Sequence, residues 1–182
     1  MRRSVLKKVT WWLIGAALVA AILVWILHIK ITTFRLGLVP ATWGVSEVLY
    51  AKDESSGFGP GGNESGIVVY RLPNAIATQL QNRGITAEAL SAKPDDERPD
   101  WAETPVSDMD WRCEPVVVCA APGRPMVENY LDRYGFGISI PKDLANELNS
   151  AISKPGAYYS HGRIGVLIVA PSVGKVYFVF SG

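Results

Sequence analysis

The sequence predicts an α+β protein in which an N-terminal transmembrane helix is followed by one small domain. We expect this domain to contain a mainly antiparallel sheet with about two principal helices on one face. Residues 9–29 form an uncharged apolar run, and short apolar stretches that end at glycine or proline recur later. We divide the chain into a basic cytoplasmic N-terminus (1–8), the transmembrane helix (9–29), a stem (30–42) and an extracytoplasmic domain (43–182).

The apolar run VTWWLIGAALVAAILVWILHI would be roughly 31 Å long as a helix, close to the ~30 Å hydrocarbon core of a bilayer. No small-residue cleavage site follows it, so we expect an uncleaved signal anchor rather than a removed signal peptide. Basic residues crowd before the run and are fewer after it: Arg2, Arg3, Lys7 and Lys8 against Lys30 and Arg35. The positive-inside rule then predicts a cytoplasmic N-terminus and a periplasmic or extracellular domain.

The part of the chain after the apolar run is acidic. Five of the 18 Lys and Arg residues, and none of the 17 Asp and Glu residues, lie at or before Lys30, so the remainder carries a net charge near −4. Because nucleic-acid-binding surfaces are basic, we expect no nucleic-acid partner. The 152 residues after Lys30 are the size of one ordinary domain.

Local patterns predict the elements of this domain in chain order. Strands are expected at 45–51, 66–72, 116–120, 135–140, 163–170 and 175–180, and helices at 74–83, 126–133 and 141–153. Gly84 follows the first helix as a C-terminal stop, and Pro141 stands where proline favours the start of a helix. The PSVG sequence between the last two strands is typical of a β-hairpin.

Residues 93–110 contain seven acidic residues and three prolines, which predicts an acidic loop. This segment has no glycine, whereas a calcium-binding loop needs a glycine turn, so no calcium site is expected. Trp101 lies in the loop and Trp111 follows it. Exposed indoles often anchor protein interfaces, so both are candidate partner-binding residues. We favour the alternative, that they hold the loop against the domain surface.

Cys113 and Cys119 are the two cysteines of the chain. In an oxidising compartment, two nearby cysteines most often form a disulfide, and this is our prediction for them. A zinc site would need two further ligands, and His161 is the one histidine outside the membrane region. We therefore expect neither a metal nor a cofactor.

Two further motifs are suggestive but incomplete. The glycine-rich segment 57–66 is followed by a strand, whereas a phosphate-binding loop is followed directly by a helix, so we interpret it as an exposed loop. His161 would have to serve any Ser-His-acid triad, yet no Gly-x-Ser-x-Gly motif surrounds a serine. The sequence therefore predicts no catalytic residue.

The segments Ile67–Leu80 and Gly135–Leu148 resemble one another at a spacing of 68 residues. Each has aliphatic residues, then proline, then a helical pattern with alanine and leucine in equivalent places. We favour the interpretation that both are strands leading into helices that begin with proline, rather than copies from a duplication.

Together these patterns predict a single-pass, membrane-anchored protein that serves as a non-enzymatic binding or accessory component of the cell envelope. Its expected partners are the lipid bilayer and another envelope protein or a second copy of itself. Two alternatives stay open. One is a membrane-tethered hydrolase with a site near His161. The other is a self-assembling structural subunit that uses Ala16, Ala20 and the C-terminal edge strand.

Overall fold

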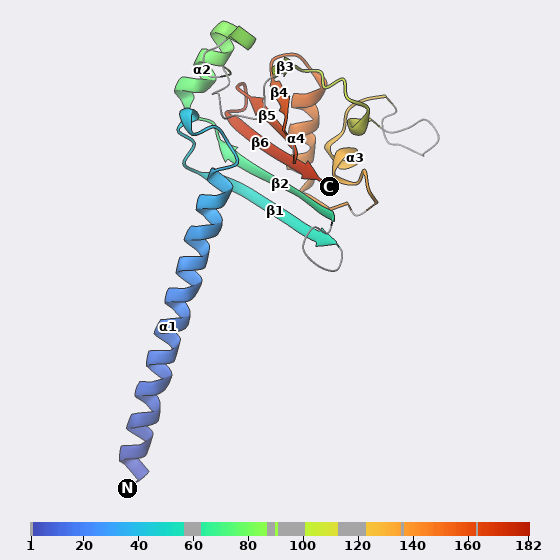
Figure 1. Cartoon of the computed structure of the whole chain (residues 1–182). Coiled ribbons are helices and arrows are strands. Elements are labelled where there is room, and N and C mark those ends of the chain that lie inside the picture. Colours follow the sequence, from blue (N-terminus) through green and yellow to red (C-terminus); the bar gives the residue numbers. More distant parts are fainter. Residues whose placement is uncertain are drawn as a thin grey trace. The chain divides into compact units, whose positions relative to one another are not determined.

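The structure is a computed structural model with two compact units, Met1–Gly37 and Leu38–Gly182 (Figure 1). The residues that it describes are 2–56, 63–86, 90, 101–112, 123–135, 137–162 and 164–182. We describe each unit by itself.

The first unit is one helix, α1 (Arg2–Leu36), of 35 residues. It ends where the backbone N–H of Gly37 donates to the carbonyls of Thr33 and Phe34, at 3.1 and 3.0 Å. Its segment Trp11–Leu36 is long and apolar enough to cross a membrane, and none of it is buried within the protein. The helix therefore continues beyond the predicted residues 9–29, and the first part of the predicted stem is helical.

The second unit is a six-stranded sheet with helices. Its strand order is β1-β2-β6-β5-β4-β3, and every pair of neighbours is antiparallel. The strands are β1 (Val48–Ser56), β2 (Asn63–Arg71), β3 (Trp101–Glu103), β4 (Tyr158–His161), β5 (Val166–Ala170) and β6 (Lys175–Ser181). The helices are α2 (Asn74–Arg83), α3 (Val127–Leu131) and α4 (Lys142–Ser153), with the short 3-10 helices η1 (Ala41–Trp43), η2 (Gly84–Thr86) and η4 (Met109–Trp111). This arrangement confirms the predicted mixture of helices and antiparallel sheet.

Several elements lie where the sequence placed them. The first predicted helix has the same bounds as α2, and Gly84 follows it with its N–H bonded to the carbonyl of Leu80. Helix α4 begins one residue after Pro141, whose fixed φ suits the residue before a helix. The β5–β6 hairpin is confirmed, with Ala170 opposite Lys175. Strands β1 and β2 also form a hairpin, each extending further toward their connection than predicted.

One predicted strand and the predicted loop need correction, and another predicted strand lies outside the described residues. Residues 137–140 are not a strand, because side chains satisfy their backbone: the Gly137 N–H donates to Asp132 at 2.8 Å, and the Ser139 carbonyl accepts from Lys52 at 2.9 Å. The predicted acidic loop contains the edge strand β3, which pairs with the unpredicted strand β4. The predicted strand 116–120 lies outside the described residues.

The sheet is buried on both faces. On one face, Ile67, Ile168 and Val179 join a core cluster with Leu148 and Ile152 of α4. Their neighbours in the strands point the other way, because successive side chains of a strand alternate between faces. These alternate residues are also buried, although they do not belong to that cluster: Val68, Tyr70, Leu167, Val169, Val176 and Phe178.

Buried side chains outside the α4 cluster include Trp43 of η1 and both Ala77 and Leu80 of α2. Figure 1 shows α2 on the other side of the sheet from α4. The expectation that the principal helices lie on one face is therefore wrong. The physical reason is that strands with continuous apolar runs need cover on both faces.

The two similar segments share a helix start rather than a strand–helix unit. The Ala77 N–H donates to the Pro73 carbonyl at 3.0 Å, and the Ala145 N–H donates to the Pro141 carbonyl at 2.9 Å. Residues 137–140, which precede the second of these prolines, are not a strand. The two segments therefore share the same local structure at the proline and at the first turn of the helix that follows it.

Candidate functional site

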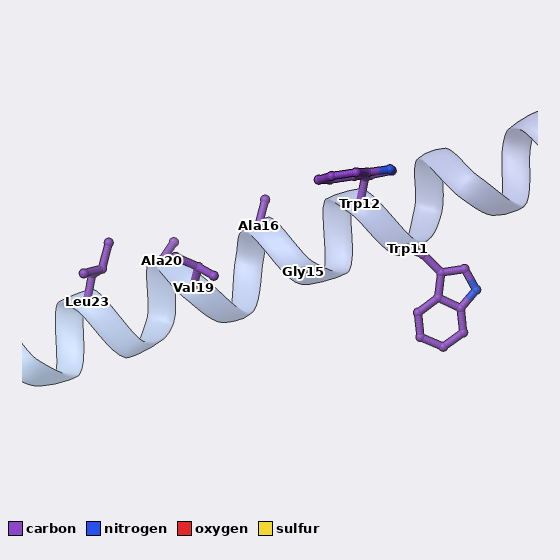
Figure 2. A pocket seen from close by; sticks show the side chains of 7 residues that line it. All are labelled: Trp11, Trp12, Gly15, Ala16, Val19, Ala20 and Leu23. Carbon is purple, nitrogen blue, oxygen red and sulfur yellow. The ribbon is translucent and has the colours of Figure 1, made fainter.

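The apolar helix α1 carries a shallow groove lined by aromatic, small and aliphatic residues. These are Trp11, Trp12, Gly15, Ala16, Val19, Ala20 and Leu23 (Figure 2). Figure 2 shows Trp12, Ala16, Ala20 and Leu23 on one side of the helix and Trp11 on the other. The groove exists because small side chains lie between large ones. Pairing of two helices through Ala16 and Ala20 stays a prediction.

Trp111 is a core residue and not an exposed anchor. Its side chain is fully buried in the cluster beneath α4, and its ring stacks on that of Tyr130 with centroids 4.4 Å apart. Its carbonyl accepts hydrogen bonds from the Met126 N–H at 2.7 Å and the Asn129 side chain at 3.2 Å. The prediction of a partner-binding Trp111 is therefore wrong, because an enclosed indole has no surface to present. It holds η4 against the domain.

Trp101 is half-buried in the edge strand β3. Its ring lies 5.7 Å from that of Trp43, between centroids. A partner-binding role for Trp101 stays a prediction.

Two side-chain contacts tie η4 to its surroundings. Asp108 caps this short helix by accepting from the Asp110 N–H at 3.2 Å, and its second carboxylate oxygen lies 3.6 Å from Nε2 of His161 at the end of β4. Asp110 accepts from Arg133, just after α3, at 2.8 Å. One three-residue helix thus connects the end of a strand with the end of another helix.

Arg133 is the most connected side chain of this region. Its guanidinium lies 4.7 Å from the ring centroids of both Tyr130 and Tyr134, a cation–π distance. It also donates to the carbonyl of Ser181 at the end of β6. Burial raises the pKa of Tyr130, Arg133 opposes this rise, and Asp110 adds to it. The phenol therefore stays protonated and neutral against the cation.

His161 has an acidic neighbour that sequence reasoning did not assign to it. The Asp108 carboxylate faces it, and the ring of Tyr159 meets its ring edge-on at 5.7 Å. The Tyr159 hydroxyl in turn lies 3.3 Å from that of Ser107. Within the described residues, no hydroxyl is hydrogen-bonded to His161 itself. The signal in the sequence was the run of acids, but their spacing does not say which carboxylate reaches the histidine.

A second polar cluster lies between α4 and β6. Glu147 accepts from Lys175 at 2.7 and 2.8 Å and from the Tyr177 hydroxyl at 2.6 Å. Burial opposes ionisation of Glu147, but these hydrogen bonds outweigh it and hold its pKa below the ordinary value. Burial and the carboxylate both raise the pKa of Tyr177. Because the partners satisfy one another, this cluster fastens α4 to the sheet.

The C-terminal half of α4, which carries Glu147, borders a hollow of about 320 Å³ beside the β5–β6 turn. It is lined by Glu147, Ser150, Ala151, Lys154, Pro155, Gly156, Ala157, Ser172 and Val173. Its one carboxylate is already bound by Lys175 and Tyr177. The carboxylate in this hollow is therefore engaged in the contact between α4 and β6.

Several predicted features lie outside the described residues. These are the disulfide of Cys113 and Cys119, residues 57–62 of the glycine-rich segment, and residues 93–100 of the acidic loop. In the part of the chain that the structure describes, no group of three or more metal-ligating side chains could hold a metal ion.

No protein-family model, curated protein or solved structure matches this chain. Its function is therefore inferred from its own residues and their contacts.

Proposed function

We propose that this protein is a single-pass, membrane-anchored component of the cell envelope, whose domain acts by binding another envelope component outside the cytoplasm. The observation that carries the proposal is the exposure of α1. Residues Trp11–Leu36 form an apolar helix in which no residue is buried. Such a surface is stable in the hydrocarbon of a bilayer and unstable in water.

Charge supports one orientation across the bilayer. Four basic residues, within residues 2–8, precede the uncharged run 9–29, whereas Lys30 and Arg35 follow that run. Basic flanks are retained in the cytoplasm, so the N-terminus is cytoplasmic and Leu38–Gly182 lies in the periplasm or outside the cell. Trp11, Trp12 and Trp25 add indole rings toward the two ends of the run, where headgroups favour them.

The tether between bilayer and domain is short. Lys30 closes the apolar run, and Val39 is already a buried residue of the domain. Nine residues can extend no more than about 30 Å, so the domain stays close to the membrane surface. A partner within that reach is a membrane protein, or a protein held at the membrane.

A topology experiment tests the anchor. We expect a reporter that is active only outside the cytoplasm to be active when fused after Gly182, and a cytoplasm-only reporter to be inactive there. The full-length chain should stay in the membrane pellet after alkaline carbonate extraction and retain its N-terminal residues by mass. Neutralising the four N-terminal basic residues should mix the two orientations. An N-terminal cleavage, or a soluble chain, would overturn the proposal.

A membrane-tethered hydrolase is the second candidate, and the pairing of His161 with Asp108 favours it, because a carboxylate orients a catalytic imidazole. The purified full-length chain can be screened with ester and amide substrates. Hydrolysis that is lost in His161→Ala would replace the binding function with an enzymatic one. Hydrolysis that is absent, or equal in His161→Ala, would contradict a hydrolase site at His161.

A further inference from the structure

We infer that strand β1 pairs with β1 of a second copy of this chain, so that two six-stranded sheets join into one continuous antiparallel sheet. This inference goes beyond the proposed function, because the partner is the chain itself rather than another envelope component. The pairing is centred on Asp53. Ala51 of each copy then lies opposite Ser55 of the other, and Lys52 of each copy lies opposite Glu54 of the other.

Strand β1 is the longer of the two edges of the sheet. It has nine residues, whereas β3 at the other edge has three (Figure 1). The C-terminal strand β6, which was predicted as an edge, lies between β2 and β5. An edge strand presents a row of backbone groups to which a further strand can bond. The edge at which a further strand has most backbone to bond is therefore β1.

The hydrogen bonds of β2 show which backbone groups of β1 face outward. Glu64 exchanges two hydrogen bonds with Gly182, just beyond β6, at 2.8 and 3.0 Å, so Glu64 directs its backbone groups toward β6. These groups alternate in direction along an antiparallel strand, so those of Ile67 are directed toward β1, where its partner is Lys52. The same alternation along β1 leaves three residues whose N–H and C=O face outward: Ala51, Asp53 and Ser55.

These outward groups match those of a second β1 strand. In the part of the chain that the structure describes, no backbone bond from another segment reaches Ala51 or Ser55. Residues of an antiparallel pair that exchange both backbone bonds lie directly opposite one another. Two β1 strands centred on Asp53 bring each outward residue opposite an outward residue of the other copy. The pairing then forms about six backbone hydrogen bonds.

The charges of β1 favour this register. Lys52 of each copy lies directly opposite Glu54 of the other, which gives two attractive cross-strand pairs on one face of the sheet. A pairing centred on Lys52 would bring lysine against lysine, and one centred on Glu54 would bring glutamate against glutamate. The two side chains are 34% and 55% exposed and lie 3.0 Å apart within one chain. In the paired strands, positive and negative charges therefore alternate around one cluster.

One like-charged pair opposes the pairing. Asp53 lies opposite its own copy on the other face of the sheet, where it is exposed to water and its charge is screened. The Cα atoms of such a hydrogen-bonded pair are about 5.5 Å apart, against about 4.5 Å for the pairs of Lys52 with Glu54. Two closer attractive pairs outweigh one more distant repulsive pair. Charges that protect an edge repel an incoming strand, whereas this charge order is complementary to itself and so selects a second copy.

Cysteine crosslinking of the full-length chain, in its native membrane, tests the register. One variant carries both Ala51→Cys and Ser55→Cys, whose Cα atoms in the paired strands are about 5.5 Å apart, within the range of a disulfide. Within one strand the two positions are about 13 Å apart, so they bond only between copies. We expect mild oxidation to link this variant into dimers at roughly ten times the yield of either single-cysteine variant. Every variant keeps Cys113 and Cys119, so their contribution is the same throughout.

Charge reversals divided between two chains test the partner. In the double-cysteine chain, Lys52→Glu brings glutamate against glutamate between copies, and Glu54→Lys brings lysine against lysine. We expect either reversal alone to lower the dimer yield roughly tenfold. When the two chains carry different tags and are made together, the mixed dimer regains both attractive pairs, although the pair within each chain stays broken. We expect the mixed dimer at the yield of the parent double-cysteine chain. The control Lys142→Glu, at an exposed lysine of α4, should leave the yield unchanged.

Three results would overturn the inference: equal dimer yields in the double-cysteine and single-cysteine variants, yields that ignore the charge reversals, or a mixed dimer that is not recovered. The last would show that only the pair within one chain matters. Every substituted residue is at least partly exposed, so the thermal melting of each variant should match that of the parent chain. Failure of the proposed function is read separately, by carbonate extraction of the same membranes. A chain that stays in the membrane but fails these tests contradicts only the β1 pairing.

Discussion

Helix α1 and strand β5 are both continuous apolar runs, yet their burial is opposite. Every residue from Val166 to Ala170 is buried, whereas Trp12 of α1 is 81% exposed and no residue of Trp11–Leu36 is buried. The difference is one of length and surroundings. A five-residue strand finds neighbours on both sides and cover on both faces, while the 26-residue apolar segment contributes no residue to the core of the described chain.

An apolar run can therefore indicate either of two kinds of element, and β5 and α1 are examples of each. In β5 it indicates a strand in the interior of the domain, covered by its own chain. In α1 it indicates a surface whose cover must come from outside the chain, for which a bilayer has the right thickness. Substitutions can test each half of this contrast, beginning with the largest expected effect.

The largest effect is expected from charges at the centre of α1. Replacing Val19 and Ala20 together with arginine should cost about 5–7 kcal/mol of membrane insertion, since each central arginine costs about 2.5–3.5 kcal/mol. We expect the chain to leave the carbonate-resistant fraction. The double leucine variant at the same positions is the control. Thermal melting of the domain should stay unchanged, and a large fall would show that α1 is covered by the domain after all.

Adjacent residues of β5 test whether both faces of the sheet are core. Ile168 belongs to the α4 cluster, and Leu167 is equally buried outside it. We expect Ile168→Ala and Leu167→Ala each to lower the free energy of unfolding by about 2–5 kcal/mol, measured by urea titration in detergent. The exposed Ile164→Ala should stay within about 0.5 kcal/mol. A loss below about 1 kcal/mol for Leu167→Ala would contradict a second core.

Removal of Arg133 should weaken the region that holds η4. Arg133→Ala breaks the contacts with Asp110 and Ser181, and we expect a loss of about 1.5–3 kcal/mol, typical of hydrogen bonds from a charged group. Arg133→Lys keeps the charge but has no planar fork to reach both acceptors, so its loss should be intermediate. Equal stability of all three chains in urea would show that these contacts do not hold the segment.

The smallest effect is expected from the pH dependence that Glu147 contributes. Its pKa is lowered in the folded chain, so the unfolded chain binds more protons and stability rises with pH through this range. The contribution is complete above the unfolded pKa of about 4.3 and is lost as pH falls through the folded value.

Glu147→Gln should flatten this acid dependence, with a loss on the order of 1 kcal/mol at pH 7, in urea titrations between pH 7 and pH 3. An acid dependence as steep in Glu147→Gln as in the parent chain would mean that other carboxylates are responsible.

Local signals were sufficient where the neighbouring residues decide the structure. Helix α2 could be placed because Pro73 and Gly84 mark its ends, and the β5–β6 hairpin because a short turn joins two β-rich runs. They failed at β3, which pairs with β4 across more than fifty residues, and at β4, which lies between β3 and β5. They failed again at 137–140, where Asp132 and Lys52 take the backbone bonds that a strand would have formed.

The candidate site shows the same limit. Sequence reasoning noticed Trp111, His161 and a run of acids, but it could not tell that the indole is enclosed or that Asp108 faces the histidine. Nor could it tell that Arg133 pairs with Asp110 and so connects η4 with the end of α3.

The sequence by itself determined the apolar helix and the acidic character of the chain after Lys30, because hydropathy and charge are sums over neighbouring residues. It also determined the helix starts at Pro73 and Pro141, since proline restricts its own backbone. Only the tertiary structure decided which helix covers which face of the sheet, and which side chains contact the aspartates of η4 and its cap. Those outcomes depend on contacts between residues far apart in the chain, and such contacts leave no local pattern.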